Sequence, residues 1–270
     1  MRPSGKIYGN QDSHFTWRGN EVMRLEYLSD IVFALAFGMI VSSGSEPRTF
    51  EELQGFLFTA LPVTAAFTFM VYIWAQHFTF FRRFGLEDGR TMFLNATLLL
   101  VVLFIAYPMR FIFDSLFGWG LMMLGDDSYV ADLQVDYRRS GIIMSYFAGG
   151  MMVVMGLFAL LYRHALSLKD ALELSPMELA ITRASFWIYL VSAFWAAVAC
   201  VGAAATPLGG FAGFIIGLSR PSARIIRWRM LPREPGRPRG VTAPSSPPRR
   251  TPASSPAQAR DNSGAALRGR

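Results

Sequence analysis

Three polar side chains interrupt long apolar runs of this chain and could do chemistry there: Asp30, His77 and Asn95. A carboxylate near the centre of a membrane-spanning helix costs roughly 2.5–3.5 kcal/mol, so it normally faces protein or water rather than lipid. An imidazole changes its charge near neutral pH. The three residues therefore indicate either a hydrogen-bond network that locks the fold or a site that takes part in gating or proton sensing.

The runs that carry these residues place them at one depth. If the first run enters the bilayer near Arg24, Asp30 lies about 9 Å along it at 1.5 Å per residue. The second run travels the other way, and His77 lies near its end, while Asn95 lies about one turn into the third run. Burying any one of these polar groups without a hydrogen-bond partner would cost free energy. We therefore expect the three side chains to form hydrogen bonds with one another at one level of the bundle.

Neighbouring residues extend this cluster. Trp74 and His77 are three residues apart and therefore share one face of a helix. Ser29 adjoins Asp30, and we expect both to face back into their own subunit. Arg24 is six residues from Asp30, too far round the helix for a same-face pair. We therefore expect Asp30 to bond across to the second and third helices.

The composition indicates a membrane protein. Of 270 residues, 52% are hydrophobic and only 17% are charged, whereas about a quarter are charged in ordinary soluble domains. Six runs approach the ~20 residues that cross a hydrocarbon core. They cover about 24–43, 56–80, 91–113, 140–162, 177–204 and a weaker stretch after the turn at 206–210. We predict an all-α membrane protein with six transmembrane helices per subunit.

Charge sets the predicted topology and the domain boundaries. Arginines gather in the loop at 82–90 and beyond the last run, whereas the segments 44–55 and 114–137 are acidic. Because cytoplasmic segments are enriched in Lys and Arg, we expect both termini to be cytoplasmic. The expected parts are a polar N-terminal arm at 1–20, a six-helix transmembrane domain at 21–230, and a disordered, basic Pro/Arg/Ser-rich tail at 231–270. Ser175 to Glu178 reads as a capping box that opens the fifth helix.

One stripe of the first run points away from the acid. Leu35, Gly38, Met39 and Ser42 follow the i, i+3, i+4, i+7 spacing of a single helix face, and Asp30 lies about 140° from Leu35 at 100° per residue. The stripe is compatible with ordinary helix packing and with a pore lining.

The motifs of the first three runs resemble those of a known family, the transmembrane protein 175 family of potassium channels. Its first-helix signature reads Arg-x-x-x-Phe-Ser-Asp-x-Val-Phe-Ala-Ile-Ala-x-Thr-Leu-Leu. The chain matches it from Arg24 through Ser29-Asp30 to Ala36, with Leu28, Leu35 and Gly38 in place of Phe, Ile and Thr, and it also carries Trp74-x-x-His77 and Leu94-Asn95. The resemblance covers roughly residues 20–220.

The resemblance implies a homotetramer in the bacterial plasma membrane that passes monovalent cations, potassium first, along an axis lined by the first helices. It assigns Leu35 and Met39 to narrow apolar rings, which gate by dewetting, and Ser42 to a wider, wetter layer. Gly38 replaces a threonine whose hydroxyl resembles a selectivity element, so a weakly selective cation pore stays open as an alternative.

Two other functions stay open. A proton-coupled secondary transporter would also bury Asp30 and His77, although the paired inverted repeats of such proteins are not visible. A non-conducting assembly or regulatory membrane protein is compatible with Gly38. The chain carries no phosphate-binding loop, H-E-x-x-H motif or catalytic triad, so we predict no enzyme, metal or cofactor. Its basic residues follow membrane topology, which predicts the lipid bilayer rather than nucleic acid as a partner.

Overall fold

The described part of the computed structural model consists of helices joined by short non-helical segments, without a strand. The structure describes residues 15–19, 24–42, 48–50, 60–125, 137–205 and 212–231, with the single positions 53 and 57. The predicted tail beyond its first residue, most of the N-terminal arm, the acidic loop at 126–136 and the turn at 206–210 lie outside the described residues.

Seven helices have defined bounds. They are α1 (Arg24–Ser42), α3 (Ala60–Phe84), α4 (Gly89–Met123), α6 (Tyr137–Ser167), α7 (Pro176–Ala205), α8 (Gly213–Gly217) and α9 (Ser219–Met230). Among the described residues, four segments are long and apolar enough to cross a membrane: Arg24–Ser42, Gly89–Met123, Arg139–Ser167 and Pro176–Ala205. The 25-residue α3 is also long enough, but Gln76, His77 and two terminal arginines make it less apolar.

Local chemistry sets the helix ends. Asp88 begins α4, because its side chain accepts a hydrogen bond from the backbone of Arg90. The predicted capping box at the start of α7 is confirmed: Glu178 N donates to Ser175 Oγ, and Ser175 N donates to Glu178 Oε2. Gly85 ends α3 with φ +58°, a conformation that suits glycine.

Two helices differ from the sequence prediction. α4 does not end near residue 113, as predicted, but continues to Met123, because most of the residues that follow are again apolar. This places Asp114 inside the helix rather than in the following loop, and it pairs there with Arg110 at 3.6 Å. The segment after the turn forms two consecutive helices, α8 and α9, instead of one run. Leu218 lies at the junction of the two.

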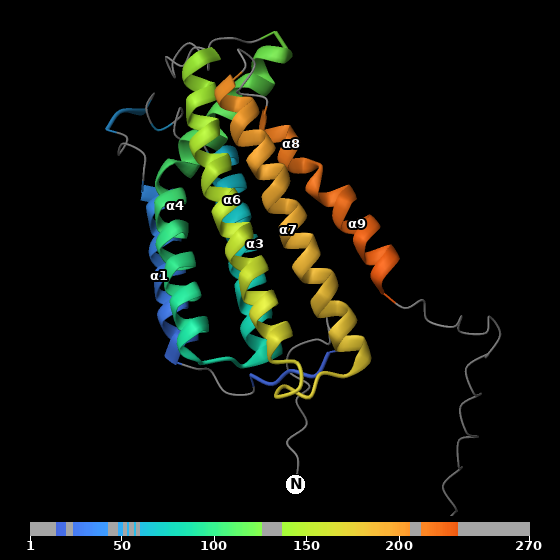
Figure 1. Ribbon diagram of the computed structural model, residues 1–270. Coiled ribbons are helices and arrows are strands. Elements are labelled where there is room, and N and C mark those ends of the chain that lie inside the picture. Colours follow the sequence, from blue (N-terminus) through green and yellow to red (C-terminus); the bar gives the residue numbers. More distant parts are fainter. Residues whose placement is uncertain are drawn as a thin grey trace, which may run out of the picture. The chain divides into compact units, whose positions relative to one another are not determined.

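From α1 to α7, successive helices run in alternating directions, and α8 and α9 together turn back alongside α7 (Figure 1). The start of α4 contacts the end of α6, because His164 Nε2 lies 2.9 Å from Asp88 Oδ2. The start of α7 contacts the chain just before α1 through Arg18 and Glu178. The end of α3 contacts the same segment, because Arg82 Nη1 donates to Gly19 O. One end of the bundle therefore gathers the starts of α1, α4 and α7 and the ends of α3 and α6.

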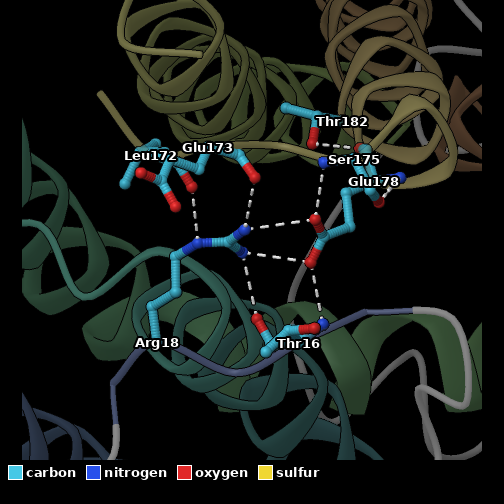
Figure 2. A network of polar contacts seen from close by, with 7 residues as sticks. All are labelled: Thr16, Arg18, Leu172, Glu173, Ser175, Glu178 and Thr182. Atoms are coloured by element: carbon cyan, nitrogen blue, oxygen red, sulfur yellow. Dashed lines mark hydrogen bonds and ion pairs between the residues drawn. The ribbon is translucent and has the colours of Figure 1, made fainter. Parts of the chain in front are cut away.

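The segment 15–19, here named the N-terminal strap, crosses this end of the bundle. Arg18 Nη1 and Nη2 donate to the two carboxylate oxygens of Glu178, each at 3.1 Å, and Arg18 Nε donates to Leu172 O (Figure 2). Thr16 N adds a third hydrogen bond to Glu178. A Cβ on Gly19 would lie 2.7 Å from Phe81 O, so only glycine lets the strap approach α3 this closely.

A candidate functional site at the contact of α1, α3 and α4

A chain of hydrogen bonds joins three helices in the interior. His77 Nε2 on α3 lies 2.7 Å from Asn95 Oδ1 on α4, and this amide oxygen accepts the bond. Asn95 Nδ2 donates to Ser29 Oγ on α1 at 3.0 Å, and Ser29 Oγ donates to Leu25 O. Ser29 and Asn95 are fully buried and His77 is 2% exposed. The partners satisfy one another, which removes most of the cost of burying them.

Asp30 has a separate partner. Trp74 Nε1 on α3 donates to Asp30 Oδ1 at 2.9 Å. In contrast to the buried Ser29, Asp30 is exposed in the single subunit. The expectation that both residues face back into the subunit therefore holds for Ser29, whereas Asp30 lies at the flank of α1 and contacts α3 through its indole partner.

The helix ends explain why these groups meet. Asp30 and Asn95 lie six residues after the first residues of α1 and α4, and His77 lies seven residues before the last residue of α3. At 1.5 Å per residue each lies about 9–11 Å from a helix end. Since α3 runs opposite to α1 and α4, the three positions fall at one level of the bundle, in agreement with the hydrogen bonds between them and their neighbours.

Aromatic rings surround the imidazole. Phe33 on α1 lies 5.5 Å from the His77 ring, and Phe81 on α3 lies 4.6 Å from it, both measured between ring centroids. Trp74 stacks on Phe78 at 5.7 Å. This packing holds both ring side chains at fixed orientations, which aims their N–H groups at the neighbouring helices.

Arg24 lies apart from this cluster. It is the first residue of α1 and is exposed, and within the described residues the structure gives it no hydrogen bond to the other cluster members. The structure thus brings together Ser29, Asp30, Trp74, His77 and Asn95, and leaves Arg24 at the helix end.

The other side of α1 faces outward. The buried residues of α1 recur every three or four positions and form its inward side: Glu26, Ser29, Phe33, Ala36 and Ile40. Leu35 is 55% exposed, Gly38 and Ser42 are exposed, and Met39 is half-buried. A Cβ on Gly38 would have no atom within 4 Å. Three residues of the predicted stripe, Leu35, Gly38 and Ser42, therefore lie outside the subunit's own packing, whereas Met39 is partly covered.

Three polar contacts were not anticipated from the sequence. They are the Arg18–Glu178 ion pair, the bond from Tyr189 Oη to Gln76 Oε1 at 2.7 Å, and the contact of His164 with Asp88. None of the three has a local sequence signal. A fourth contact, the i, i+4 pair of Arg110 and Asp114, does have one, but the predicted helix ended one residue before Asp114. In the described part of the chain, no three His, Cys, Asp or Glu side chains gather in a way that could hold a metal ion.

Comparisons with known proteins identify the family. The profile of the family described as "Endosomal/lysosomal potassium channel TMEM175" matches residues 24–106, a stretch that contains α1, α3, the start of α4 and every predicted site residue. A protein named "Potassium channel" from Marivirga tractuosa is 30% identical over 175 residues, which are 64% of this chain and 70% of that protein. The chain belongs to the TMEM175 potassium channel family.

A solved TMEM175 structure supports this assignment. A variant of the potassium channel MtTMEM175, crystallised with a nanobody–MBP fusion protein, aligns with a TM-score of 0.68 and 27% identity. The alignment covers 80% of this chain and 96% of that one. Together with the apolar helices, this makes the chain a multi-pass membrane protein of a channel family rather than a member of an enzyme class.

Proposed function

We propose that this TMEM175 chain forms a passive cation channel for which potassium is the main permeant ion. Copies of α1 surround a central axis, with Leu35 and Met39 forming narrow apolar rings and Ser42 a wider, polar layer. The relatives in this family are named potassium channels. The main support for α1 as the pore helix is that it makes its polar contacts on one side and leaves Leu35, Gly38 and Ser42 outside the subunit's own packing.

The hydrogen-bond network has a structural role in this proposal. Asp30 links α1 to α3 and Ser29 links it to α4 through side-chain hydrogen bonds. The rotation of α1 about its own axis is thereby fixed, and the opposite stripe is directed toward the axis. An apolar ring resists ion passage because an ion cannot shed its water cheaply there. One subunit supplies one such helix, so the pore requires several copies, and we propose a homotetramer.

The membrane arrangement completes the proposal. α3 and the pair α8–α9 add two crossings to the four apolar helices, which gives six crossings per subunit in a bacterial plasma membrane. The strap end of the bundle, with Arg18, Arg82 and Arg90, then lies in the cytoplasm, as the enrichment of cytoplasmic loops in arginine favours.

Ion flux into proteoliposomes tests this function. The natural protein should carry potassium down its gradient, without a proton gradient and without saturation at millimolar potassium. Gly38→Thr should raise the ratio of potassium to sodium flux, because the new hydroxyl ring partly replaces ion hydration. Open space around Gly38 allows this side chain. Flux that saturates and stops when the proton gradient is collapsed would instead show a coupled transporter, and no flux at all would contradict the channel.

A further inference from the structure

A polar cavity of about 320 Å³ lies between α3, α6, α7 and the end of α9, away from the network described above. One stripe of α3 lines it with the polar side chains of Tyr72, Gln76, Thr79 and Arg83, spaced four, three and four residues apart. In a membrane protein a polar stripe on a helix faces protein or an aqueous cavity, since lipid cannot satisfy it. The cavity is therefore a candidate binding site.

The charge of the lining is positive. Arg83 from α3 and Arg227 from α9 both line the cavity, and the described lining residues include no Asp or Glu. Tyr189 from α7 lies between the two helices and donates to Gln76 Oε1. Guanidinium groups with hydroxyl and amide neighbours are suited to bind phosphate oxygens.

The packing of α9 against α7 brings Arg227 to the edge of the cavity. Trp195 Nε1 on α7 donates to Ser222 Oγ on α9 at 3.0 Å, which anchors the helix beside α7 (Figure 1). Ser222 and Ile226 are half-buried on the packed side, whereas Arg224, Arg227 and Arg229 are all exposed. Of these three arginines, only Arg227 lines the cavity.

We infer that this cavity binds the phosphate headgroup of an anionic phospholipid. Besides the two arginines, the apolar side chains of Met155, Ile181 and Ile188 line the cavity, so it offers contacts for an acyl chain as well as for a phosphate headgroup. Basic pockets between transmembrane helices bind anionic headgroups on the cytoplasmic side of membranes. The assignment of the ligand to the cytoplasmic leaflet rests on the topology proposed above, whereas the phosphate site itself does not depend on ion conduction.

Native mass spectrometry of the full-length protein in detergent tests the inference, with phosphatidylglycerol as the probe and phosphatidylcholine as the neutral comparison. The natural protein should bind phosphatidylglycerol more tightly. Arg227→Gln should weaken that binding about fivefold, as expected for one arginine at an anionic lipid. The matched variants Arg224→Gln and Arg229→Gln remove the same charge from the same helix outside the cavity and should bind like the natural protein.

Three outcomes would overturn the inference. Equal loss in all three arginine variants would show general attraction of the basic helix for lipid. Equal binding of both lipids would exclude recognition of negative charge. Soluble glycerol phosphate that binds as tightly as phosphatidylglycerol would keep the phosphate site and reject the lipid as its source. All readouts are binding measurements, so a protein that binds phosphatidylglycerol but carries no current would contradict the channel alone.

Discussion

Asn95 on α4 donates a 3.0 Å hydrogen bond to Ser29 on α1, although 66 residues separate them in the chain. The same amide accepts from His77 on α3, so one side chain holds three helices together. All three groups lie in the interior, where a polar group without a hydrogen-bond partner lowers the stability of the fold by more than a formed hydrogen bond raises it. The contact of α1 with its subunit is therefore specified by polar pairing in addition to apolar packing.

Removing the central amide should destabilise the subunit. Asn95→Leu leaves His77 and Ser29 without their buried partner, which should lower the free energy of unfolding by about 1–3 kcal/mol. Thermal unfolding in detergent, followed by intrinsic tryptophan fluorescence, measures the change. Thr97→Ala on an exposed side of the same helix is the matched control and should change stability by less than about 0.5 kcal/mol. An Asn95→Leu protein as stable as that control would exclude the network as a structural element.

The N-terminal strap should stabilise the start of α7. Arg18→Met leaves the Glu178 carboxylate, whose side chain is 4% exposed, without its cation, and breaking such a pair costs about 3–5 kcal/mol. The double variant Arg18→Met with Glu178→Gln should recover part of the loss, because no charge is then left buried. Arg24→Met, which removes an exposed arginine nearby, should unfold like the natural protein. Equal melting temperatures for the Arg18 and Arg24 variants would mean that the strap carries no stability.

The contact between α4 and α6 predicts a pH dependence. Partial burial alone would raise the pKa of the Asp88 carboxyl, but hydrogen bonds from Thr91 and His164 hold that pKa below its ordinary value. A carboxyl whose pKa is lower in the folded state adds stability above its unfolded pKa of about 3.9 and loses it as the pH falls through the folded value.

The matching variant is Asp88→Asn, because asparagine still caps the helix and only the charge is lost. Its melting temperature should lie below that of the natural protein from pH 5 to 7, and the gap should close as the pH falls below about 4. Glu87→Gln, a neighbouring exposed acid, should show no such pattern. A gap that stays constant down to pH 3 would rule out the carboxylate charge as its source.

The sequence predicts the depth of the buried polar side chains in the bundle better than it predicts their hydrogen-bond partners. Residue type and alternating helix direction suffice to expect Asp30, His77 and Asn95 at one depth. Which donor meets which acceptor depends on the rotation of each helix, and the structure pairs Asp30 with Trp74 and Asn95 with Ser29. Periodicity gives such rotations only to within a fraction of a turn.

Long-range contacts were beyond sequence reasoning for a physical reason. The capping role of Glu178 is local and could be predicted, whereas its ion pair with Arg18 joins residues 160 positions apart. The predicted third helix ended near residue 113, but α4 continues to Met123 with Pro108 inside it, because a proline inside a packed membrane helix is tolerated where neighbours satisfy the freed backbone groups. The side of α1 on which Leu35 lies could be predicted from the first helix alone. The residues that would face Leu35 across the proposed axis belong to other copies of the chain, so the sequence of one copy does not place them.

The unitary conductance of the Leu35→Ala channel tests the central claim most directly. If four Leu35 side chains form the narrow ring, removing about 1 kcal/mol of the dewetting barrier should raise the single-channel current in planar bilayers about fivefold. Leu100→Ala on α4 is the matched control, since both leucines are 55% exposed in the subunit, and it should leave the current unchanged. An unaltered current in Leu35→Ala, or the same change in both variants, would contradict a pore lined by α1.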